Sequence, residues 1–287
     1  MMTIAAKRRL RCDPAGYHLP VMLGAGAVVL FLILASCGMA GFNSGESDRP
    51  HLEESFPSTA PADPSAGRVG SRPHAPTLPP DTPGLHQFGL ESGRDGLLYV
   101  PAIYHPEAPA PLVLMLHGAG GDARGGIDPF LALADRAGLL LLAPDSRGST
   151  WDLVLGSHGP DVTFITRALS HVFDRYAVDI AHVGIEGFSD GASYALSLGL
   201  TNGDLFTHVI AFSPGFFASP DAVGSPRIFV SHGTDDRVLP IDRTSRLLTP
   251  HLKTRGYELA YEEFHGGHVV PNDTAQRALD WFLQSPG

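Results

Sequence analysis

Residues 85–287 alternate between short, continuous apolar runs and longer stretches in which apolar positions recur every three to four residues. Continuous apolar runs are typical of strands buried on both faces of a parallel sheet. The runs that predict such strands are residues 112–116, 139–143, 182–186, 209–212 and 228–230, and residues 259–264 are predicted as the last strand. Ahead of them, residues 85–90 and 97–100 flank a glycine-containing turn, which predicts an antiparallel hairpin.

The stretches between these runs have helical periodicity. Residues 162–176 carry apolar side chains at helical spacing, with Asp161 as the expected N-cap. Shorter helices are predicted for residues 129–137, after Pro240 and near the chain end, where Asn272 is the expected cap. Strands that alternate with helices indicate one α/β domain over residues 85–287, with a mostly parallel central sheet and helices on both faces.

The first 84 residues follow a different pattern. Four basic residues between positions 7 and 11 precede an apolar run over residues 21–35, which is typical of a secretion signal. The run ends in Leu-Ala-Ser-Cys, which resembles the lipobox of bacterial lipoproteins and implies that residues 1–36 are removed and Cys37 is lipidated. The alternative is an uncleaved transmembrane helix, because no charged residue occurs between Asp13 and Glu46. Both interpretations predict an exported, membrane-anchored protein at the cell envelope.

The segment that follows is rich in proline. Nine prolines, with Ser, Ala, Asp and Gly between them, lie in residues 43–84, and apolar clusters are scarce. Such a composition buries too little apolar surface to fold. We therefore expect residues 37–84 to form a disordered tether and residues 85–287 to form the globular domain.

Charge and cysteine content narrow the possible partners. The net charge is −10, and loss of residues 1–36, with four basic residues and one acid, would make it −13. An acidic domain is a poor ligand for nucleic acid or for anionic lipid, so we expect no nucleic-acid partner and membrane contact through the anchor alone. The two cysteines are Cys12 and Cys37, which leaves the expected domain without a disulfide.

The first candidate catalytic motif is Gly-Phe-Ser-Asp-Gly at residues 187–191, between a predicted strand and a predicted helix. In the G-x-S-x-G pattern the serine lies on a sharp strand-to-helix turn, and the flanking glycines avoid a clash with the crossing helix. Ser189 would then lie at a helix N-terminus, where backbone N–H groups stabilise negative charge on a substrate oxygen.

A serine nucleophile needs a base and an acid, and both occur after later strands. Asp235 and Asp236 follow the strand at 228–230, while His265 and His268 follow the last strand. The order Ser, Asp, His is that of one hydrolase fold. His268 is favoured over His265 as the base, because the glycine pair before it lets the loop bend back toward Ser189.

Taken together, residues 96–283 resemble the α/β-hydrolases, and more narrowly the phospholipase/carboxylesterase and polyhydroxybutyrate-depolymerase-like esterases. The matching stretches are residues 116–121, 187–191, 232–240 and 266–268. The resemblance implies Ser189 as nucleophile, His268 as base and an acid in the 235–236 pair. The family spacing favours Asp236 over Asp235, and the family's oxyanion hole corresponds to the backbone N–H groups of Ala119 and Asp190.

Several other residues near these loops have two interpretations. Trp151, Phe216 and Phe217 either shape a substrate pocket or pack beneath a loop. His117 and His232 each precede a glycine at a strand end, where a hydrogen bond to loop backbone is the expected role. No histidine pair has H-x-x-x-H or H-E-x-x-H spacing, so we assign no metal and no cofactor.

The expected function is a serine-dependent carboxylic ester hydrolase that acts through an acyl-enzyme on a small-molecule or polymeric ester. A serine peptidase of the same fold and a non-catalytic, tethered binding lipoprotein are the alternatives. Only 15 residues separate Phe212 from Ile228, too few for a cap domain, so we expect an open site and a preference for short acyl groups.

Overall fold

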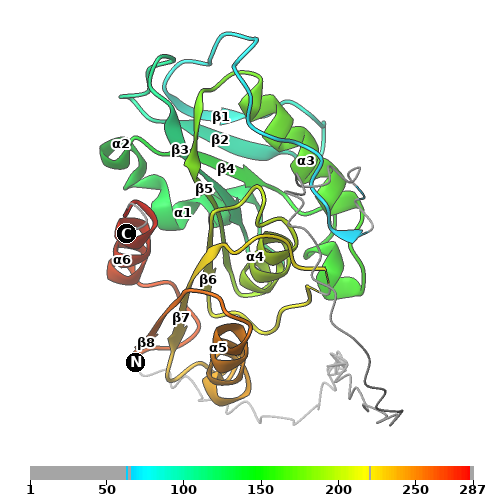
Figure 1. Ribbon diagram of the computed structural model, residues 1–287, viewed down its shortest axis with the longest axis vertical. Coiled ribbons are helices and arrows are strands. Elements are labelled where there is room, and N and C mark those ends of the chain that lie inside the picture. Colours follow the sequence, from blue (N-terminus) through cyan, green and yellow to red (C-terminus); the bar gives the residue numbers. More distant parts are fainter. Residues whose placement is uncertain (1–62, 64–65, 220, 285–287) are drawn as a thin grey trace, which may run out of the picture. The chain divides into compact units, whose positions relative to one another are not determined.

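The fold is built on an eight-stranded sheet with strand order β1-β2-β4-β3-β5-β6-β7-β8 (Figure 1). The computed structural model describes residues 63, 66–219 and 221–284. The strands are β1 (Gly84–Gln87), β2 (Gly96–Val100), β3 (Ala110–Leu116), β4 (Leu140–Pro144), β5 (Val178–Phe188), β6 (His208–Phe212), β7 (Arg227–Gly233) and β8 (Leu259–Phe264). β1 and β2 pair antiparallel and β2 joins β4 antiparallel, whereas all pairs from β4 to β8 are parallel.

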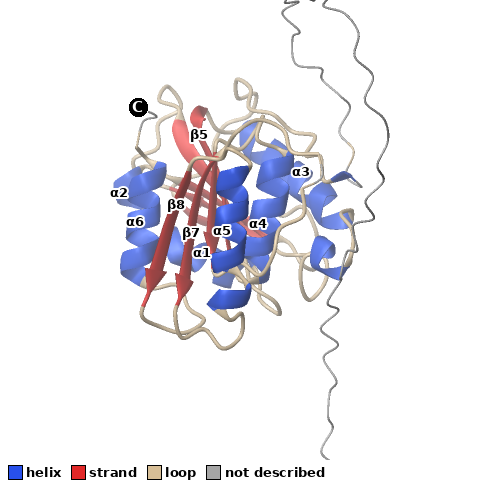
Figure 2. Cartoon of the chain, turned by 60° about the horizontal axis from the view of Figure 1, so that its bottom comes forward, coloured by secondary structure: helices blue, strands red, loops and turns tan. Residues whose placement is uncertain are grey.

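Helices cover both faces of this sheet, as Figure 2 shows. They are α1 (Ala123–Leu131), α2 (Ala134–Ala137), α3 (Pro160–Phe173), α4 (Asp190–Thr201), α5 (Ser245–Thr254) and α6 (Asn272–Phe282), with short 3-10 helices η2 (Asp152–Leu155) and η3 (Ile241–Arg243). α1, α2 and α6 bury apolar residues on one face, and α3, α4 and α5 do so on the other. This arrangement confirms the α/β fold with a mostly parallel sheet.

Three predicted helix starts are wrong. The first helix begins at Ala123 rather than at Pro129, because the Asp122 carboxylate caps it by accepting hydrogen bonds from the backbone N–H groups of Arg124 and Gly125. Pro129 lies inside that helix. α3 begins at Pro160, so Asp161 is inside the first turn instead of at the N-cap. α6 begins at Asn272 itself, and Pro271 is the N-cap, so Asn272 does not cap that helix.

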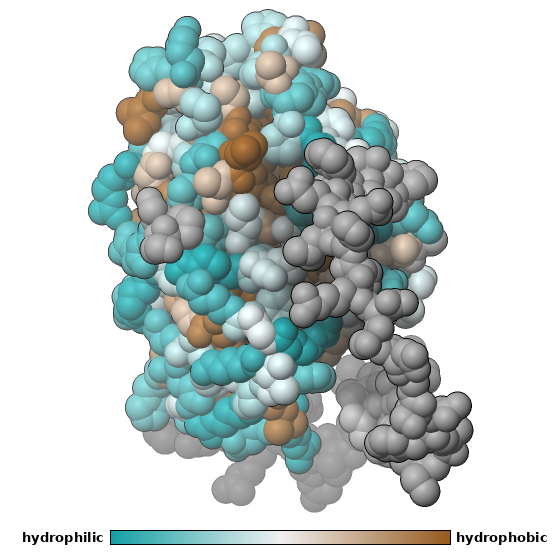
Figure 3. Space-filling view, in the orientation of Figure 1, coloured by the Kyte–Doolittle hydropathy of each residue, from teal (hydrophilic) through white to brown (hydrophobic). Residues whose placement is uncertain are grey.

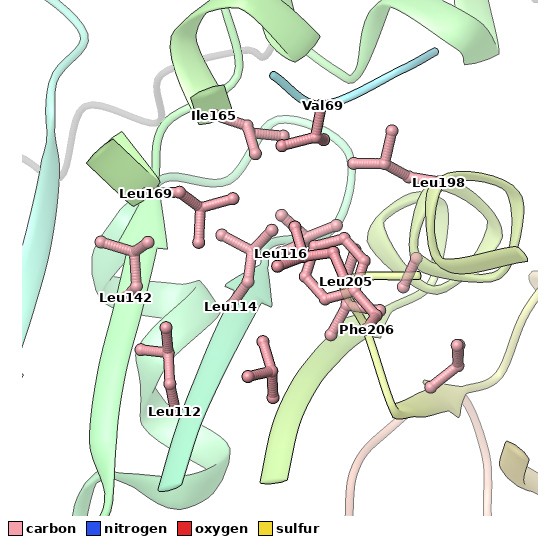
Figure 4. Packing of buried hydrophobic residues seen from close by; sticks show 14 of the residues in the cluster. Val69, Leu112, Leu114, Leu116, Leu142, Ile165, Leu169, Leu198, Leu205 and Phe206 are labelled. Atoms are coloured by element: carbon pink, nitrogen blue, oxygen red, sulfur yellow. The ribbon is translucent and has the colours of Figure 1, made fainter. Parts of the chain in front are cut away.

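The predicted tether is also wrong for residues 66–84, which pack against the domain. Val69 is 2% exposed and lies between Ile165 and Leu198 in the core (Figure 4). Its backbone N–H donates to the Asn202 side chain at 2.9 Å, and the Asp204 carboxylate pairs with two arginines of the segment. A single apolar anchor and these polar contacts hold a proline-rich stretch whose composition alone indicates no fold. Residues 37–62, 64 and 65 of the predicted tether, like the predicted signal segment at residues 1–36, lie outside the described residues.

Val69→Ala is expected to lower the free energy of unfolding by about 2 kcal/mol, because it removes two buried methyl groups and leaves a cavity. Leu78 is the matched control, since it lies in the same segment and is 45% exposed. Leu78→Ala should change stability by less than about 0.5 kcal/mol. Chemical denaturation of both variants tests this, and equal small effects would mean that the segment does not contribute to the core.

The sheet's carboxyl edge carries loops rather than a cap. The described residues between β6 and β7 form no helix, so no helical layer covers the end of β5 from that connection. On the face shown in Figure 3, hydrophilic residues predominate and hydrophobic ones occur in small groups. Within the described part of the chain, no helix is both long and apolar enough to cross a bilayer.

Candidate active site

Ser189 lies at the sharp turn between β5 and α4. Its backbone has φ 58°, a left-handed conformation that is strained for a residue with a side chain. Gly187 and Gly191 make the turn possible, because a Cβ on Gly187 would overlap the Gly191 carbonyl and one on Gly191 would overlap the Leu116 carbonyl. The turn therefore has the geometry that the G-x-S-x-G pattern predicts.

The structure brings His268 and Asp236 to this serine. His268 Nε2 lies 2.8 Å from Ser189 Oγ, and His268 Nδ1 lies 2.6 Å from Asp236 Oδ2. The imidazole packs on Phe188, with ring centroids 4.6 Å apart. The three predicted residues thus form one hydrogen-bonded chain, although they come from loops after β5, β7 and β8.

Asp236 is fixed from its other side by backbone and by a second histidine. Its Oδ1 accepts hydrogen bonds from the N–H groups of Val238 and Leu239, each at 2.8 Å, and its Oδ2 lies 3.2 Å from His232 Nε2. Burial acts to raise the pKa of Asp236, but the hydrogen bonds from His268, Leu239 and Val238 outweigh it and hold the pKa below its ordinary value. The buried carboxyl is therefore ionised and oriented.

The two candidates that were not favoured pair with each other instead. His265 Nδ1 lies 3.0 Å from Asp235 Oδ2, and the two side chains are 92% and 63% exposed. Neither contacts Ser189 among the described interactions. Asp235 and His265 are therefore a surface pair, whereas Asp236 and His268 are the pair that is linked to Ser189.

Two backbone N–H groups were predicted to form an oxyanion hole: that of Ala119, in the loop after β3, and that of Asp190, which directly follows Ser189. Asp190 is the first residue of its helix, and neither N–H group donates to an acceptor among the described residues. The Asp190 carboxylate accepts a hydrogen bond from Thr150 Oγ1 at 2.7 Å, which occupies one of its oxygens. Gly120 N–H donates to Ser149 O at 2.6 Å, so the loops after β3 and β4 are joined at this point.

The three aromatic residues that were predicted to shape a substrate pocket have different surroundings in the structure. Trp151 is fully buried, donates its indole N–H to His117 O at 2.8 Å and stacks on Tyr194, so the prediction that it shapes the pocket is wrong. Phe217 packs toward α5, with its ring 5.6 Å from that of His251, which fits packing beneath a loop rather than a pocket wall. Phe216 is half-buried in the loop after β6, and its pocket role stays a prediction.

The expected roles of the two other loop histidines are confirmed. His117 Nδ1 donates to Gly118 O at 2.7 Å while its Nε2 accepts from Ser146 N–H at 3.0 Å, and burial lowers its pKa. His232 Nε2 donates to Leu239 O at 2.8 Å. Both histidines therefore hold loop backbone. No cluster of three or more His, Cys, Asp or Glu that could hold a metal occurs among the described residues.

Sequence reasoning missed Ser193, which lies on α4 four residues after Ser189, the N-cap of that helix. Its buried Oγ donates to Ser189 O at 3.3 Å and accepts from Gly215 N–H at 2.9 Å. This hydroxyl ties the loop after β6 to the start of α4. The i+4 spacing of two serines on an otherwise apolar helix is the signal that points to it.

Glu186, three residues before Ser189, is a buried side chain with no bonding role among the described residues. It lies on β5, is 1% exposed, and neither carboxyl oxygen has a partner among the described residues. Burial raises its pKa well above the usual range, which favours the protonated carboxyl in the folded state.

Glu186→Met is expected to raise the free energy of unfolding, and more so at pH 8 than at pH 5. Because the folded pKa is raised, the acid's contribution to stability is greatest below its unfolded pKa and is lost as the pH rises. The gain at pH 5 should be about 1–3 kcal/mol, the cost of an unpaired buried polar group, and the gain at pH 8 should be larger. Guanidinium unfolding at both pH values measures it, with Glu107→Gln as an exposed control; a gain that does not depend on pH would contradict this account.

An eight-stranded, mostly parallel sheet with a serine on a strained turn after its central strand defines the α/β-hydrolase class. A family model described as Phospholipase/Carboxylesterase matches residues 164–284. Feruloyl esterase C of Emericella nidulans is 30% identical over 189 residues, which cover 63% of this chain and 67% of that protein. The chain therefore belongs to the α/β-hydrolase esterase family and is an ester hydrolase, which confirms the resemblance read from its motifs.

Solved structures agree on the fold. Esterase PE8 is similar with a TM-score of 0.54 and 23% identity, over 65% of this chain and 96% of that one. A ferulic acid esterase of Anaeromyces mucronatus is similar with a TM-score of 0.54 and 17% identity, over 74% of this chain and 95% of that one. At these identities the likeness extends to the fold alone.

Proposed function

We propose that this protein hydrolyses carboxylic esters through an acyl-enzyme on Ser189, with His268 as general base and Asp236 as the acid of a Ser-Asp-His triad. The observation that carries the proposal is the hydrogen-bonded chain from Ser189 Oγ through His268 to the buried Asp236 carboxylate, at 2.8 and 2.6 Å. Both are hydrogen-bonding distances: the first allows His268 to take the proton of Ser189, and the second allows Asp236 to orient the imidazole.

In the first half-reaction, Ser189 Oγ attacks the ester carbonyl carbon while its proton passes to His268 Nε2. The C–O bond to the alcohol then breaks, and the same Nε2 gives the proton to the leaving oxygen. Water repeats the sequence on the acyl-enzyme: it loses a proton to His268, attacks the carbonyl and releases the acid, and Ser189 regains its proton. The Asp236 carboxylate stabilises the imidazolium in both halves, since its lowered pKa keeps it ionised.

The backbone N–H groups of Ala119 and Asp190 are the proposed oxyanion hole. They are unpaired among the described residues, and the Asp190 N–H is at the positive end of α4. Negative charge that develops on the carbonyl oxygen would be stabilised there more than the neutral ester, which is the condition for catalysis.

For the acyl part of the substrate, the relatives favour an aromatic acid and the fold favours a short chain. Feruloyl esterase C is the name of the 30% identical relative, and we extend that substrate class to this chain as a proposal. The absence of a helical cap in the described β6–β7 connection leaves few walls for a long acyl chain, whose burial is worth about 0.8 kcal/mol per methylene.

A panel of methyl esters tests this proposal: ferulate, acetate, butyrate, octanoate and palmitate, together with peptide amides. We expect the highest kcat/KM for ferulate or for the short acyl groups, and no amide hydrolysis. Dominant hydrolysis of amides would favour the peptidase, and a preference for palmitate would show that a buried acyl tunnel exists. Hydrolysis of none, with no fluorophosphonate labelling, would favour a binding protein.

We also propose that the domain is exported and held at the cell envelope by a lipid on Cys37, a residue outside the described part of the chain. Cys37→Ser should leave the precursor uncut and abolish incorporation of a fatty-acid analogue, because the lipid attaches to that thiol. Metabolic labelling of both proteins in a bacterial host measures it. Label that persists in Cys37→Ser, or its absence from the unmodified protein, would favour the transmembrane alternative.

A further inference from the structure

A groove runs from the edge of His268 between α1 and the N-terminus of α6. It encloses about 330 Å³, enough for roughly ten heavy atoms at the volume that liquid water occupies per molecule. Phe188, Pro129 and Val270 supply apolar lining, and Asp128 and Asn272 supply the polar groups. His268 itself is part of the wall, so the groove opens next to the proposed base.

The chemistry of ester cleavage places one half of the substrate on this side. His268 Nε2 must come within hydrogen-bonding distance of the leaving oxygen, because it supplies the proton that this oxygen takes. The carbonyl oxygen points instead to the N–H groups of Ala119 and Asp190. The acyl and alcohol parts leave the carbonyl carbon in different directions, so the part that borders His268 is the alcohol.

The groove also has a definite charge. Asp128 is exposed on α1, and its carboxylate has no hydrogen-bond or ion-pair partner among the described residues. No lysine or arginine belongs to the lining, so nothing in the groove neutralises that charge. An anionic group on the alcohol would meet Asp128, whereas a neutral or cationic one would not be repelled.

We propose that this groove binds the alcohol portion of the ester and that Asp128 selects against anionic alcohols. The proposal rests on the proposed function, because it takes the role of His268 as given. It adds a specificity-determining residue that lies outside the Ser189, His268 and Asp236 chain.

Two isomeric esters test the acyl side and the alcohol side of the site independently. Monobutyl glutarate carries its charge on the acyl part, and the butyrate ester of omega-hydroxyvalerate carries it on the alcohol. Asp128→Asn should raise kcat/KM for the second about threefold and Asp128→Lys about tenfold, less so at high salt, as expected for exposed charges. Monobutyl glutarate and neutral pentyl butyrate should stay within about twofold, as should all three esters with the control Glu107→Gln.

Gly125 also lines the groove, so a large side chain at this position tests the proposal by blocking the groove. A Cβ at this position meets nothing within 4 Å, so a side chain there would extend into open space without disturbing α1. Gly125→Phe should lower kcat/KM for cyclohexyl butyrate about tenfold, on the scale of a steric block, and leave methyl butyrate unchanged. Gly125→Ala is the matched control and should leave both esters unchanged.

Equal responses of the two charged isomers to the Asp128 variants, or equal responses of methyl and cyclohexyl butyrate to Gly125→Phe, would overturn the proposal. Ser189→Ala, run beside these variants, distinguishes the two levels of inference. If that variant still hydrolyses the esters, the proposed function fails; if it does not, and the groove variants behave as wild type, the groove alone is misassigned.

Discussion

Ser189→Ala is expected to lower kcat for ester hydrolysis by about 10⁴-fold or more and to abolish fluorophosphonate labelling, because loss of a serine nucleophile removes the covalent route altogether. The effect should fall on chemistry and not on folding. Ser189 Oγ bonds only to His268 Nε2 among the described contacts, and alanine keeps the Cβ that the strained turn already accommodates. The free energy of unfolding should therefore change by less than about 0.5–1 kcal/mol.

Ser213 offers a matched control for this variant. It is the other non-glycine residue with positive φ in the described chain, at 54°, and it is 1% exposed at the end of β6. Its Oγ makes no hydrogen bond to the described residues, so Ser213→Ala removes a similar hydroxyl without breaking the chain to His268. Turnover by Ser189→Ala above a few per cent of wild type would refute the nucleophile, whereas equal losses in both variants would point to the turn geometry.

Asp236→Asn is expected to lower kcat by about 10³–10⁴-fold, since the amide no longer fixes the imidazole tautomer or offsets its positive charge. The carboxylate has no nearby substitute: its Oδ2 is the partner of His268 Nδ1, and its Oδ1 is already held by the N–H groups of Val238 and Leu239. The structure of the loop should survive, because the amide oxygen can still accept those two bonds.

Asp235→Asn is the control for the acid, because it makes the same chemical change one residue away. Its side chain is 63% exposed and pairs with His265, so we expect activity within about twofold of wild type. Steady-state kinetics and far-UV circular dichroism of both variants measure activity and folding together. A greater loss for Asp235→Asn would exchange the two assignments.

Local sequence patterns predict the centre of this molecule well. The strands around Ser189 are predictable because burial on both faces requires uninterrupted apolar runs, as at β3, β4 and β6. The sharp turn at Ser189 is predictable because Gly187 and Gly191 each lie so close to other backbone atoms that a Cβ would overlap them. His268 is distinguishable from His265 since only the residue after the glycine pair can turn back to the serine.

Features that depend on distant parts of the chain are less predictable. Val69 packs between α3 and α4 and is held by Asn202, more than a hundred residues away, so the composition of its own segment carries no sign of it. Trp151 follows β4 on the same edge as the site, but whether its ring faces the site or the core depends on Tyr194 and His117 from other elements. Neither contact is encoded in local periodicity.

The most direct test of the account is to map the covalent adduct of a fluorophosphonate on the intact protein while ester hydrolysis is followed. We predict one adduct per chain, located on Ser189 by peptide mass spectrometry, with activity lost in proportion to its formation. Asp236→Asn should form the same adduct more slowly, because the base is no longer oriented. Hydrolysis that continues after Ser189 is fully modified, or inactivation that accompanies an adduct on another residue, would contradict the account.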